Sequence, residues 1–364
     1  MRVIMTGGGT GGHIYPAIAI ADKITERSNY SKILFVGTQR GLESRLVPQA
    51  GYDIEFIDVS GLDRRNLLKD VKVIRKYRKA KKQAKAIIEV FKPDVVIGTG
   101  GYVSGPLVSQ AASMGIRCFI QEQNAVAGLT NRVLGRHVEK IFLGFEEGGN
   151  SFKQKEKLVV SGNPVRDAFY HADRKACRDL LGIPEDCSFV LSFGGSQGSG
   201  KINRAMMDVA LRFSGRKDVI VCFVTGRTYY EPIRTELEEK GVDLEGNIHV
   251  IDYVDEMQNY LPAADLVISR SGALTVSEIA LCGVPSILIP SPNVTGDHQT
   301  FNARALSDKG GAVLLREDEL SGESLGDEVE RLLSNPGLLE GMAEQTRKVA
   351  PVDAADIIYY GIIK

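Results

Sequence analysis

Residues 4–16 read Ile-Met-Thr-Gly-Gly-Gly-Thr-Gly-Gly-His-Ile-Tyr-Pro, a run in which glycine fills five of the six positions 7–12. The apolar residues before the glycines predict a short buried strand, and the run 17–24 after them predicts a helix. A glycine loop between a strand and a helix presents backbone N–H groups and the positive helix end to an anion. A tight turn alone would explain a pair of glycines. Because the ionisable His13 lies at the mouth of the predicted helix, we favour a site for a phosphate-bearing substrate.

The glycine run does not match the common nucleotide-binding fingerprints. Gly7, Gly9 and Gly12 satisfy a loose GxGxxG pattern, but the acidic residue of a dinucleotide site is missing at the end of the next predicted strand, 33–37. No Gly-Lys-Ser/Thr sequence follows at the spacing of a P-loop. The sequence therefore predicts neither a dinucleotide site nor a P-loop.

Length and composition indicate a globular protein of two domains. The 364 residues exceed what one ordinary core accommodates, and the net charge of −1 gives no case for nucleic-acid binding. The cysteines lack CxxC spacing, which indicates reduced thiols in the core rather than a disulfide or zinc framework. They are Cys118, Cys177, Cys187, Cys222 and Cys282. Since the chain begins on a predicted strand and no apolar run approaches ~20 residues, we expect no signal peptide and at most peripheral membrane contact.

Short β-branched runs alternate with helical stretches, which predicts parallel α/β sheets. The predicted strands are 2–6, 32–36, 54–58, 95–99, 118–121, 140–143, 158–160, 189–193, 219–225, 248–251, 266–269, 286–289 and 312–315. The pattern restarts at 189–200, where a strand again runs into a glycine-rich loop. The chain therefore reads as two similar halves of the nucleotide-binding type, joined at the extended Asn-Pro segment 162–166.

Two further stretches of the first half carry candidate functional residues. The glycine-rich loop 98–106 contains Tyr102, and the polar cluster 121–124 follows the next predicted strand. Because the loops after parallel strands meet at one sheet edge, a favourable strand order would bring Tyr102 and this cluster close to His13. For Tyr102 alone, a packing role is an equal alternative.

Residues 64–92 form a basic amphipathic segment. Twelve of these twenty-nine residues are Lys or Arg, against two acids, and apolar residues recur at helical spacing. Such a helix can lie against anionic lipid headgroups. The alternative is a core helix whose solvated face happens to be basic.

Two stretches of the second half carry further candidates. Residues 265–278 predict a strand, a turn and a helix that carries Glu278, a carboxylate able to accept both hydroxyls of a ribose. A helix-dipole contact is the alternative role for Glu278. The polar loop 290–299 contains His298 and Gln299, which suit a sugar; a surface-loop histidine is the alternative for His298.

Taken together, six blocks in this order resemble the MurG family, the bacterial N-acetylglucosaminyltransferases of peptidoglycan synthesis. The blocks are Gly8–His13, Gly98–Pro106, Glu122–Asn124, Gly162–Arg166, Gly194–Gly198 and Ser271–Glu278. The resemblance spans about residues 1–350. It departs from the family pattern at one pair, which is Gln-Gln in the family and His298-Gln299 here.

The resemblance implies a GT-B architecture, α/β in class, with two Rossmann-like parallel-sheet domains facing across a cleft. It implies an acceptor and membrane-associating domain at 1–163, a UDP-GlcNAc-binding domain at 164–345, and a C-terminal helix at 346–364 that packs back on the first domain. The implied reaction is inverting transfer of GlcNAc from UDP-GlcNAc to the C4 hydroxyl of MurNAc in undecaprenyl-pyrophosphoryl-MurNAc-pentapeptide (lipid I), giving lipid II. Another GT-B transferase that forms glycolipids, or a non-catalytic sugar-nucleotide sensor, is the alternative.

The resemblance also implies roles for individual residues. For the donor it implies that the diphosphate and linker are bound by Arg166, Ser196 and Gln197, and the sugar and phosphates by Ala273, Leu274 and Thr275. It implies Val254 at the uracil, Glu278 at the ribose, and His298 and Gln299 at the GlcNAc hydroxyls. Further donor contacts that it implies are Thr10, Gly11, Gly12 and Asn124. For the acceptor it implies Gly9, Thr10, His13, Tyr102 and Asn124.

His13 is the candidate base, because histidine has an ordinary pKa near ~6.5. The chain has no Asp-x-Asp metal motif, so we expect no metal or other cofactor, and charge on the departing UDP would be met by helix dipoles, backbone N–H groups and Arg166. A lipid acceptor favours membrane contact for segment 64–92, with the protein peripheral on the cytoplasmic face of the cell membrane. Other proteins of cell-wall synthesis are further candidate partners.

Overall fold

The structure is a computed structural model that describes residues 1–59, 70–350 and 353–364. It divides into two compact units. Unit 1 comprises Met1–Arg166 and Pro351–Lys364, and unit 2 comprises Asp167–Ala350. From the sequence, these two boundaries were expected at 163 and 345.

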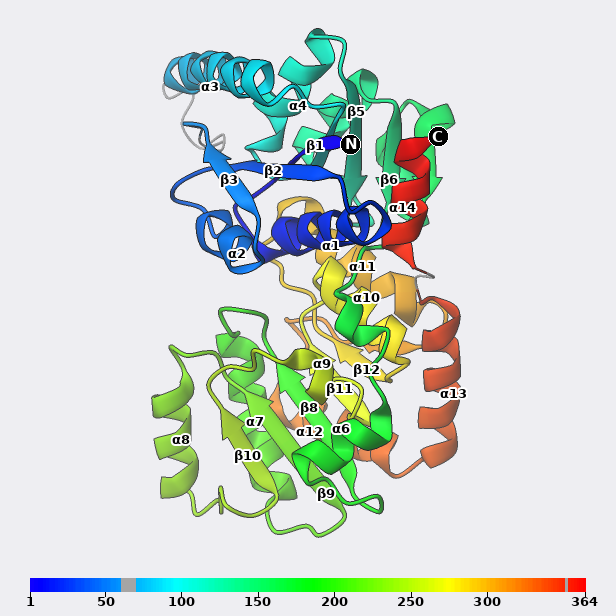
Figure 1. Ribbon diagram of the computed structural model, residues 1–364. Helices are drawn as coiled ribbons and strands as arrows, with labels where there is room; N and C mark the ends of the chain where they lie inside the picture. Colours follow the sequence, from blue (N-terminus) through cyan, green and yellow to red (C-terminus); the bar gives the residue numbers. More distant parts are fainter. Residues whose placement is uncertain (60–69, 351–352) are drawn as a thin grey trace. The chain divides into compact units, whose positions relative to one another are not determined.

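Unit 1 is built on a parallel sheet (Figure 1). Its strands are β1 (Arg2–Gly7), β2 (Lys32–Gly37), β3 (Asp53–Phe56), β4 (Val95–Gly100), β5 (Arg117–Glu122), β6 (Lys140–Leu143) and β7 (Leu158–Val160). Their order across the sheet is β3-β2-β1-β4-β5-β6-β7. The order reverses between β1 and β4, so the glycine loop after β1 lies beside the loop after β4.

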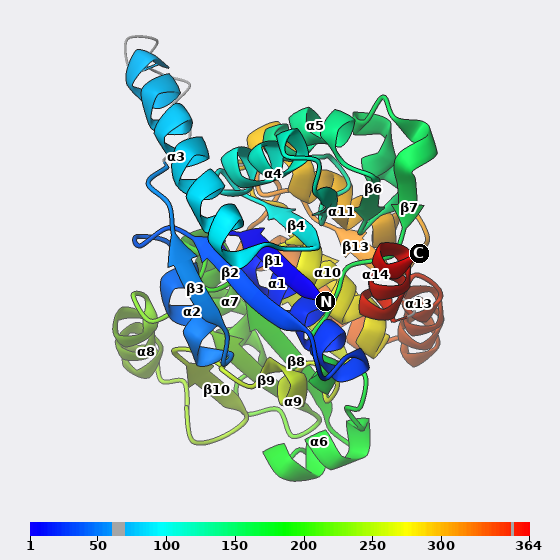
Figure 2. The same cartoon turned by 45° about the horizontal axis from the view of Figure 1, so that its top comes forward.

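Helices cover both faces of this sheet. They are α1 (Gly11–Arg27), α2 (Glu43–Gln49), α3 (Asp70–Phe91), α4 (Ser104–Ser113), α5 (Leu129–Leu134) and α14 (Ala354–Ile363). Buried residues of α3, α4 and α5 form one core cluster with the sheet, and those of α1, α2 and α14 form another. The C-terminal α14 packs beside α1, with Ile358 and Ile362 fully buried (Figures 1 and 2). The end of the chain therefore completes the core of unit 1.

Unit 2 repeats the architecture. Its strands are β8 (Ser188–Phe193), β9 (Val219–Val224), β10 (Ile248–Ile251), β11 (Leu266–Ser269), β12 (Ser286–Leu288) and β13 (Ala312–Leu314), in the parallel order β10-β9-β8-β11-β12-β13. Its helices are α6 (Arg174–Leu181), α7 (Gly200–Phe213), α8 (Tyr230–Glu239), α9 (Met257–Tyr260), α10 (Ala273–Cys282), α11 (His298–Ser307), α12 (Gly322–Leu333) and α13 (Pro336–Lys348). Apolar residues of α7, α8 and α12 fill a core on one face of the sheet. Here the order reverses between β8 and β11.

Every strand that the sequence predicted is a strand of the structure, with bounds that agree to within two residues. The first helix is a correction, since α1 begins at Gly11 rather than at Ala17. Gly11 and Gly12 therefore belong to the first helical turn and not to the loop.

Of the five cysteines, which the sequence predicts as thiols in the core, Cys118, Cys177 and Cys222 are buried, whereas Cys187 and Cys282 are partly exposed. Burial raises the pKa of Cys118 and of Cys222 to about 12, which keeps both thiols protonated at neutral pH.

Among residues 1–59, 70–350 and 353–364, no helix is both long enough and apolar enough to cross a bilayer. Of the predicted basic segment, residues 64–69 lie outside the described residues, and the rest from Asp70 onward forms α3 and Lys92.

Candidate active site

In each unit a glycine loop with predicted functional residues leaves the carboxyl end of a strand at the point where the strand order reverses. Such a switch point opens a crevice because neighbouring loops turn to opposite faces of the sheet. In unit 1 this point lies between β1 and β4, and in unit 2 between β8 and β11. Both glycine loops lie at these points.

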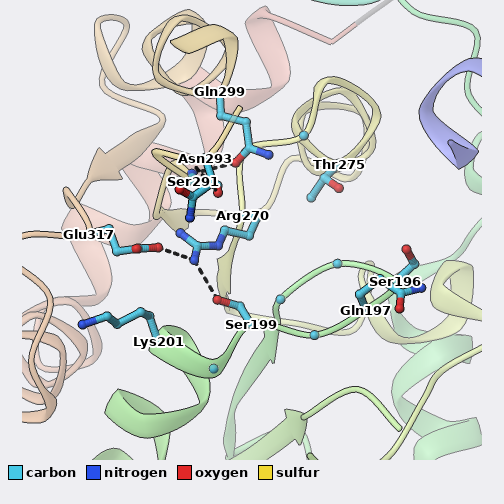
Figure 3. Close-up of a pocket in the computed structure, with 15 residues that line it drawn as sticks. Ser196, Gln197, Ser199, Lys201, Arg270, Thr275, Ser291, Asn293, Gln299 and Glu317 are labelled. Carbon is cyan, nitrogen blue, oxygen red and sulfur yellow. Dashed lines mark hydrogen bonds and ion pairs between the residues drawn. The ribbon is translucent and has the colours of Figure 1, made fainter. Parts of the chain in front are cut away.

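A cavity of about 750 Å³ lies at the switch point of unit 2 (Figure 3). Its lining comes from the loop after β8 and from the carboxyl ends of β11, β12 and β13. The lining residues are Gly194, Gly195, Ser196, Gln197, Gly198, Ser199, Gly200, Lys201, Arg270, Gly272, Thr275, Ser291, Asn293, Gln299 and Glu317. A volume of ~300–1,000 Å³ is typical of small-molecule sites.

The glycine loop after β8 leads into the N-terminus of α7 at this cavity. Ser199 is the N-cap, and its side chain accepts a hydrogen bond from the backbone N–H of Ile202. Gly198 has a φ of +73°, and a Cβ on it would lie 2.1 Å from the carbonyl oxygen of Thr225, so only glycine fits. The close approach of Gly198 to Thr225 fixes the shape of the loop at the N-terminus of α7. This helix has fourteen residues, and the dipole at its N-terminus favours an anion.

Arg270 contacts three segments around the cavity, and its contacts with Ser199 and Glu317 are drawn in Figure 3. Its Nη1 donates to the carbonyl oxygens of Ile289 and Pro290 at 3.2 and 3.1 Å. Its Nη2 donates to Ser199 Oγ at 2.7 Å and to the Glu317 carboxylate. The side chains of Arg270 and Glu317 are 14% and 15% exposed. Both terminal nitrogens of the guanidinium are therefore committed to protein acceptors.

The structure brings four of the predicted donor residues to this cavity, namely Ser196, Gln197, Thr275 and Gln299. Gln299 is in the first turn of α11 rather than in a loop, and its Oε1 accepts from the backbone N–H of Ser291 at 2.8 Å. His298, expected in the same loop, is the first residue of α11.

Other predicted donor residues lie outside the lining of the cavity. Ala273, Leu274 and Glu278 belong to α10, which begins at the cavity, and Val254 follows β10 at the same sheet edge. Arg166, Thr10, Gly11, Gly12 and Asn124 belong to unit 1.

In unit 1, a buried carboxylate holds the glycine loop. Glu43 is 1% exposed, and its Oε2 accepts from the backbone N–H of Gly9 at 3.0 Å. Its Oε1 accepts from the N–H and the hydroxyl of Thr38 at 2.9 and 2.7 Å. The side chain of Tyr102 lies beside Gly9, with its hydroxyl 3.5 Å from Thr38 Oγ1. Three predicted acceptor residues, Gly9, Thr10 and Tyr102, thus lie on loops at the β1–β4 edge.

The hydrogen bonds of His13 define its tautomer. Its Nδ1 lies 2.9 Å from Gln123 Oε1 and 3.1 Å from the carbonyl oxygen of Thr99. The amide nitrogen of Gln123 donates to the same carbonyl at 2.7 Å, which orients Oε1 toward the ring. Because Nδ1 faces two acceptors, it carries the proton of the neutral ring, and the lone pair is on Nε2. His13 can therefore accept a proton at Nε2.

A chain of buried amides continues behind His13. Gln123 donates to the side chain of Gln121, Gln121 donates to Asn163 Oδ1 at 2.9 Å, and Asn163 donates back to the carbonyl oxygen of Gln123 at 3.0 Å. All three side chains are at most 1% exposed. The Asn-Pro segment that leaves unit 1 is thus hydrogen-bonded to the residue that orients His13.

Asn124, predicted for both substrates, is positioned by a second buried carboxylate. Glu122 is 1% exposed, and its Oε1 accepts from the backbone and side-chain nitrogens of Asn124 at 3.0 and 3.1 Å. Its Oε2 accepts from Asn131 and from the N–H of Gly128 at 2.9 and 3.0 Å. These bonds hold the loop after β5 at the same edge as His13.

Several of these residues were not among those predicted from the sequence. Gln123 and Arg270 lie inside the stretches singled out from the sequence, so their polar character next to a strand end was an available signal. Glu43 and Glu317 stand in ordinary polar stretches and carry no such signal. Within the described parts of the chain, no cluster of three or more His, Cys, Asp or Glu residues could hold a metal ion.

Both units of the chain are similar to known proteins. The family model described as the glycosyltransferase family 28 N-terminal domain matches residues 3–143, and that of the C-terminal domain matches residues 189–358. A relative from Thermoanaerobacter sp. (strain X514) is 43% identical over 359 residues, covering 99% of this chain and 98% of the relative. Its name is UDP-N-acetylglucosamine–N-acetylmuramyl-(pentapeptide) pyrophosphoryl-undecaprenol N-acetylglucosamine transferase.

A relative of the same name from Desulforamulus reducens (strain ATCC BAA-1160 / DSM 100696 / MI-1) is 42% identical over 361 residues, covering 98% and 97% of the two chains. The crystal structure of Acinetobacter baumannii MurG matches with a TM-score of 0.78 at 30% identity, covering 100% of this chain and 99% of that one. The prediction of a GT-B protein with two Rossmann-like parallel-sheet units is confirmed. The chain belongs to glycosyltransferase family 28 and, within it, to the MurG family of N-acetylglucosamine transferases.

Proposed function

We propose that this chain transfers GlcNAc from UDP-GlcNAc to the C4 hydroxyl of MurNAc in undecaprenyl-pyrophosphoryl-MurNAc-pentapeptide, with inversion at the anomeric carbon. The observation that carries the proposal is the full-length similarity to transferases named for this reaction. The two glycine loops at the switch points fit a pair of substrates that each contain a diphosphate.

In the donor half, the cavity of unit 2 would hold the diphosphate of UDP-GlcNAc at the N-terminus of α7. Departing UDP gains negative charge, which the N–H groups of the glycine loop, the helix dipole and the exposed Lys201 would stabilise. We propose that the reaction needs no divalent cation, because the chain has no Asp-x-Asp motif and backbone donors are supplied instead. The predicted role of Arg166 at the diphosphate is part of the same proposal.

In the acceptor half, His13 would act as the general base. Its Nε2 would take the proton of the acceptor C4 hydroxyl as that oxygen bonds to the anomeric carbon and the bond to the UDP oxygen breaks. Gln123 and Thr99 hold the ring in the tautomer that this step requires. Tyr102 and Asn124 would contact the acceptor from the neighbouring loops.

The acceptor is a lipid, so the enzyme must reach a membrane surface. We propose that the basic face of α3 makes this contact on the cytoplasmic side of the cell membrane. Ala80, Ala84 and Ile88 are buried in the core of unit 1, whereas Lys76 and Lys82 are exposed. The apolar side of the helix is thus occupied by the fold, and the contact would be electrostatic.

The test is UDP release from UDP-GlcNAc with a water-soluble lipid I analogue, with diacylglycerol, and without acceptor. We expect release that depends on the lipid I analogue and unchanged turnover when the divalent cation is removed by EDTA. Release with diacylglycerol in place of the analogue would indicate another glycolipid-forming transferase. Binding of UDP-GlcNAc without turnover on any acceptor would indicate a sugar-nucleotide sensor.

A further inference from the structure

Glu317 places a negative charge in the cavity that is proposed to bind a diphosphate. It lines this cavity together with the cations Lys201 and Arg270. A carboxylate and a diphosphate repel each other, and in a partly enclosed site this repulsion is weakly screened. A cavity built only for tight diphosphate binding would have no acidic residue here.

The pairing of Glu317 with Arg270 explains how the carboxylate is kept in place. Arg270 donates to Glu317 through Nη2, and the same nitrogen donates to Ser199 Oγ at 2.7 Å. Nη1 is occupied by the carbonyl oxygens of Ile289 and Pro290. The guanidinium therefore braces the cavity wall, and its positive charge is offset by the carboxylate beside it (Figure 3).

We propose that Glu317 lowers the affinity of the cavity for diphosphates, so that the UDP product can leave after transfer. The inference rests on the proposed function, because it assigns UDP as the product. Lys201 and the N-terminus of α7 supply the attraction that binds the donor. The negative charge of Glu317 cancels most of the attraction that the positive charge of Arg270 would otherwise exert on a diphosphate.

The proposal predicts the sign of a substitution. Glu317→Gln removes the negative charge but keeps a side-chain oxygen that can accept from Arg270, so the brace is preserved. The freed positive charge of Arg270 should then tighten diphosphate binding about tenfold, since charge pairs in a protein site interact at a low effective dielectric constant. Uridine carries no phosphate charge, so its affinity should not change.

The experiment is calorimetric titration of UDP, uridine and inorganic pyrophosphate into the wild-type protein and three variants. Glu317→Gln should bind UDP and pyrophosphate more tightly and uridine as the wild type does. Glu317→Asp retains the charge and should bind all three ligands nearly as the wild type does. Glu319→Gln makes the same substitution at an exposed position outside the cavity lining and should change nothing.

Weaker or unchanged binding of pyrophosphate and UDP by Glu317→Gln would overturn the proposal, because a purely structural brace predicts that result. An equal change for uridine would also overturn it. Tighter binding by Glu317→Asp would show that charge is not the cause. Wild-type protein that binds pyrophosphate but not UDP would contradict the proposed function, while the pyrophosphate comparison would still decide the role of Glu317.

Discussion

The amide oxygen of Gln123 lies 2.9 Å from Nδ1 of His13, at the place where the histidine base of a hydrolytic triad has a carboxylate. An amide fixes the tautomer of the ring without adding a negative charge. The amide therefore orients the imidazole and places its proton on Nδ1. With Nδ1 directed at protein acceptors, Nε2 is the ring nitrogen that can take the proton of the acceptor hydroxyl.

His13→Ala tests the role of the ring itself. If His13 is the base, kcat should fall about 10²–10⁴-fold, because the proton of the acceptor hydroxyl loses its acceptor. Affinity for UDP-GlcNAc, measured by calorimetry, should stay unchanged. A rise in the acceptor KM with unchanged kcat would make His13 a binding contact instead.

Gln123→Glu tests the orienting role of the amide. A carboxylate beside Nδ1 should favour the protonated ring, so the acid limb of the kcat–pH profile should move to higher pH. The matched control is Gln49→Glu, at an exposed position of the same unit, which should leave the profile in place. A profile shifted equally in both variants would mean that general charge, and not the contact with His13, is responsible.

Glu278→Ala tests the predicted ribose contact. Loss of a charged hydrogen-bond acceptor should weaken binding of UDP and of uridine by roughly 1–3 kcal/mol. Calorimetry on both ligands is the measurement, and pyrophosphate serves as the control ligand because it has no ribose. Unchanged UDP affinity would assign Glu278 to the structure of α10 alone.

Charge reversal on α3 tests membrane contact. Lys76, Arg78 and Lys82 are exposed, whereas Lys79 is paired with Asp58 at 3.0 Å and is left intact. Reversing the first three residues to Glu should lower the binding constant for anionic vesicles about a hundredfold, since each basic residue near the surface contributes on the order of 1 kcal/mol. Sedimentation of the protein with vesicles of increasing lipid concentration measures this constant. Raised salt should weaken vesicle binding of the wild type.

The control for this reversal carries the same charge change elsewhere. Lys153, Lys217 and Lys309 are exposed and distant in sequence from α3, and their reversal should leave vesicle binding largely intact. Turnover of a soluble acceptor should be the same for both triple variants. Vesicle binding that survives the α3 reversal and high salt would make α3 a core helix with a solvated basic face.

Gly361→Ala tests the docking of α14. A Cβ at Gly361 would lie 2.6 Å from the ring of the fully buried Phe142, so the substitution should lower the free energy of unfolding by about 1–3 kcal/mol. In α13, a Cβ at Gly341 meets no atom within 4 Å, and Gly341→Ala should stabilise by about 0.4–1 kcal/mol. Denaturant unfolding checks both. Equal effects of the two substitutions would contradict close packing at Gly361.

The sequence by itself determined the strands and their parallel arrangement. Each β-branched run, such as 95–99 or 266–269, is apolar over the length of a buried strand. This pattern involves only neighbouring residues, so it can be read without knowing the rest of the fold. The repeated strand and glycine loop also indicated two similar halves. The start of α1 was misjudged because the prediction followed the run 17–24, whereas the helix also includes Gly11 and Gly12 and has Pro16 inside it.

Only the tertiary structure decided which side chains act together. Glu43 reaches Gly9 across thirty-four positions of sequence, Gln123 reaches His13 across 110, and Glu317 reaches Arg270 across forty-seven. These contacts depend on the order of strands in each sheet, which brings the ends of β2, β1, β4 and β5, and of β8, β11 and β13, to common edges. Strand order is set by how whole helices and strands pack, and no local run of residues encodes it.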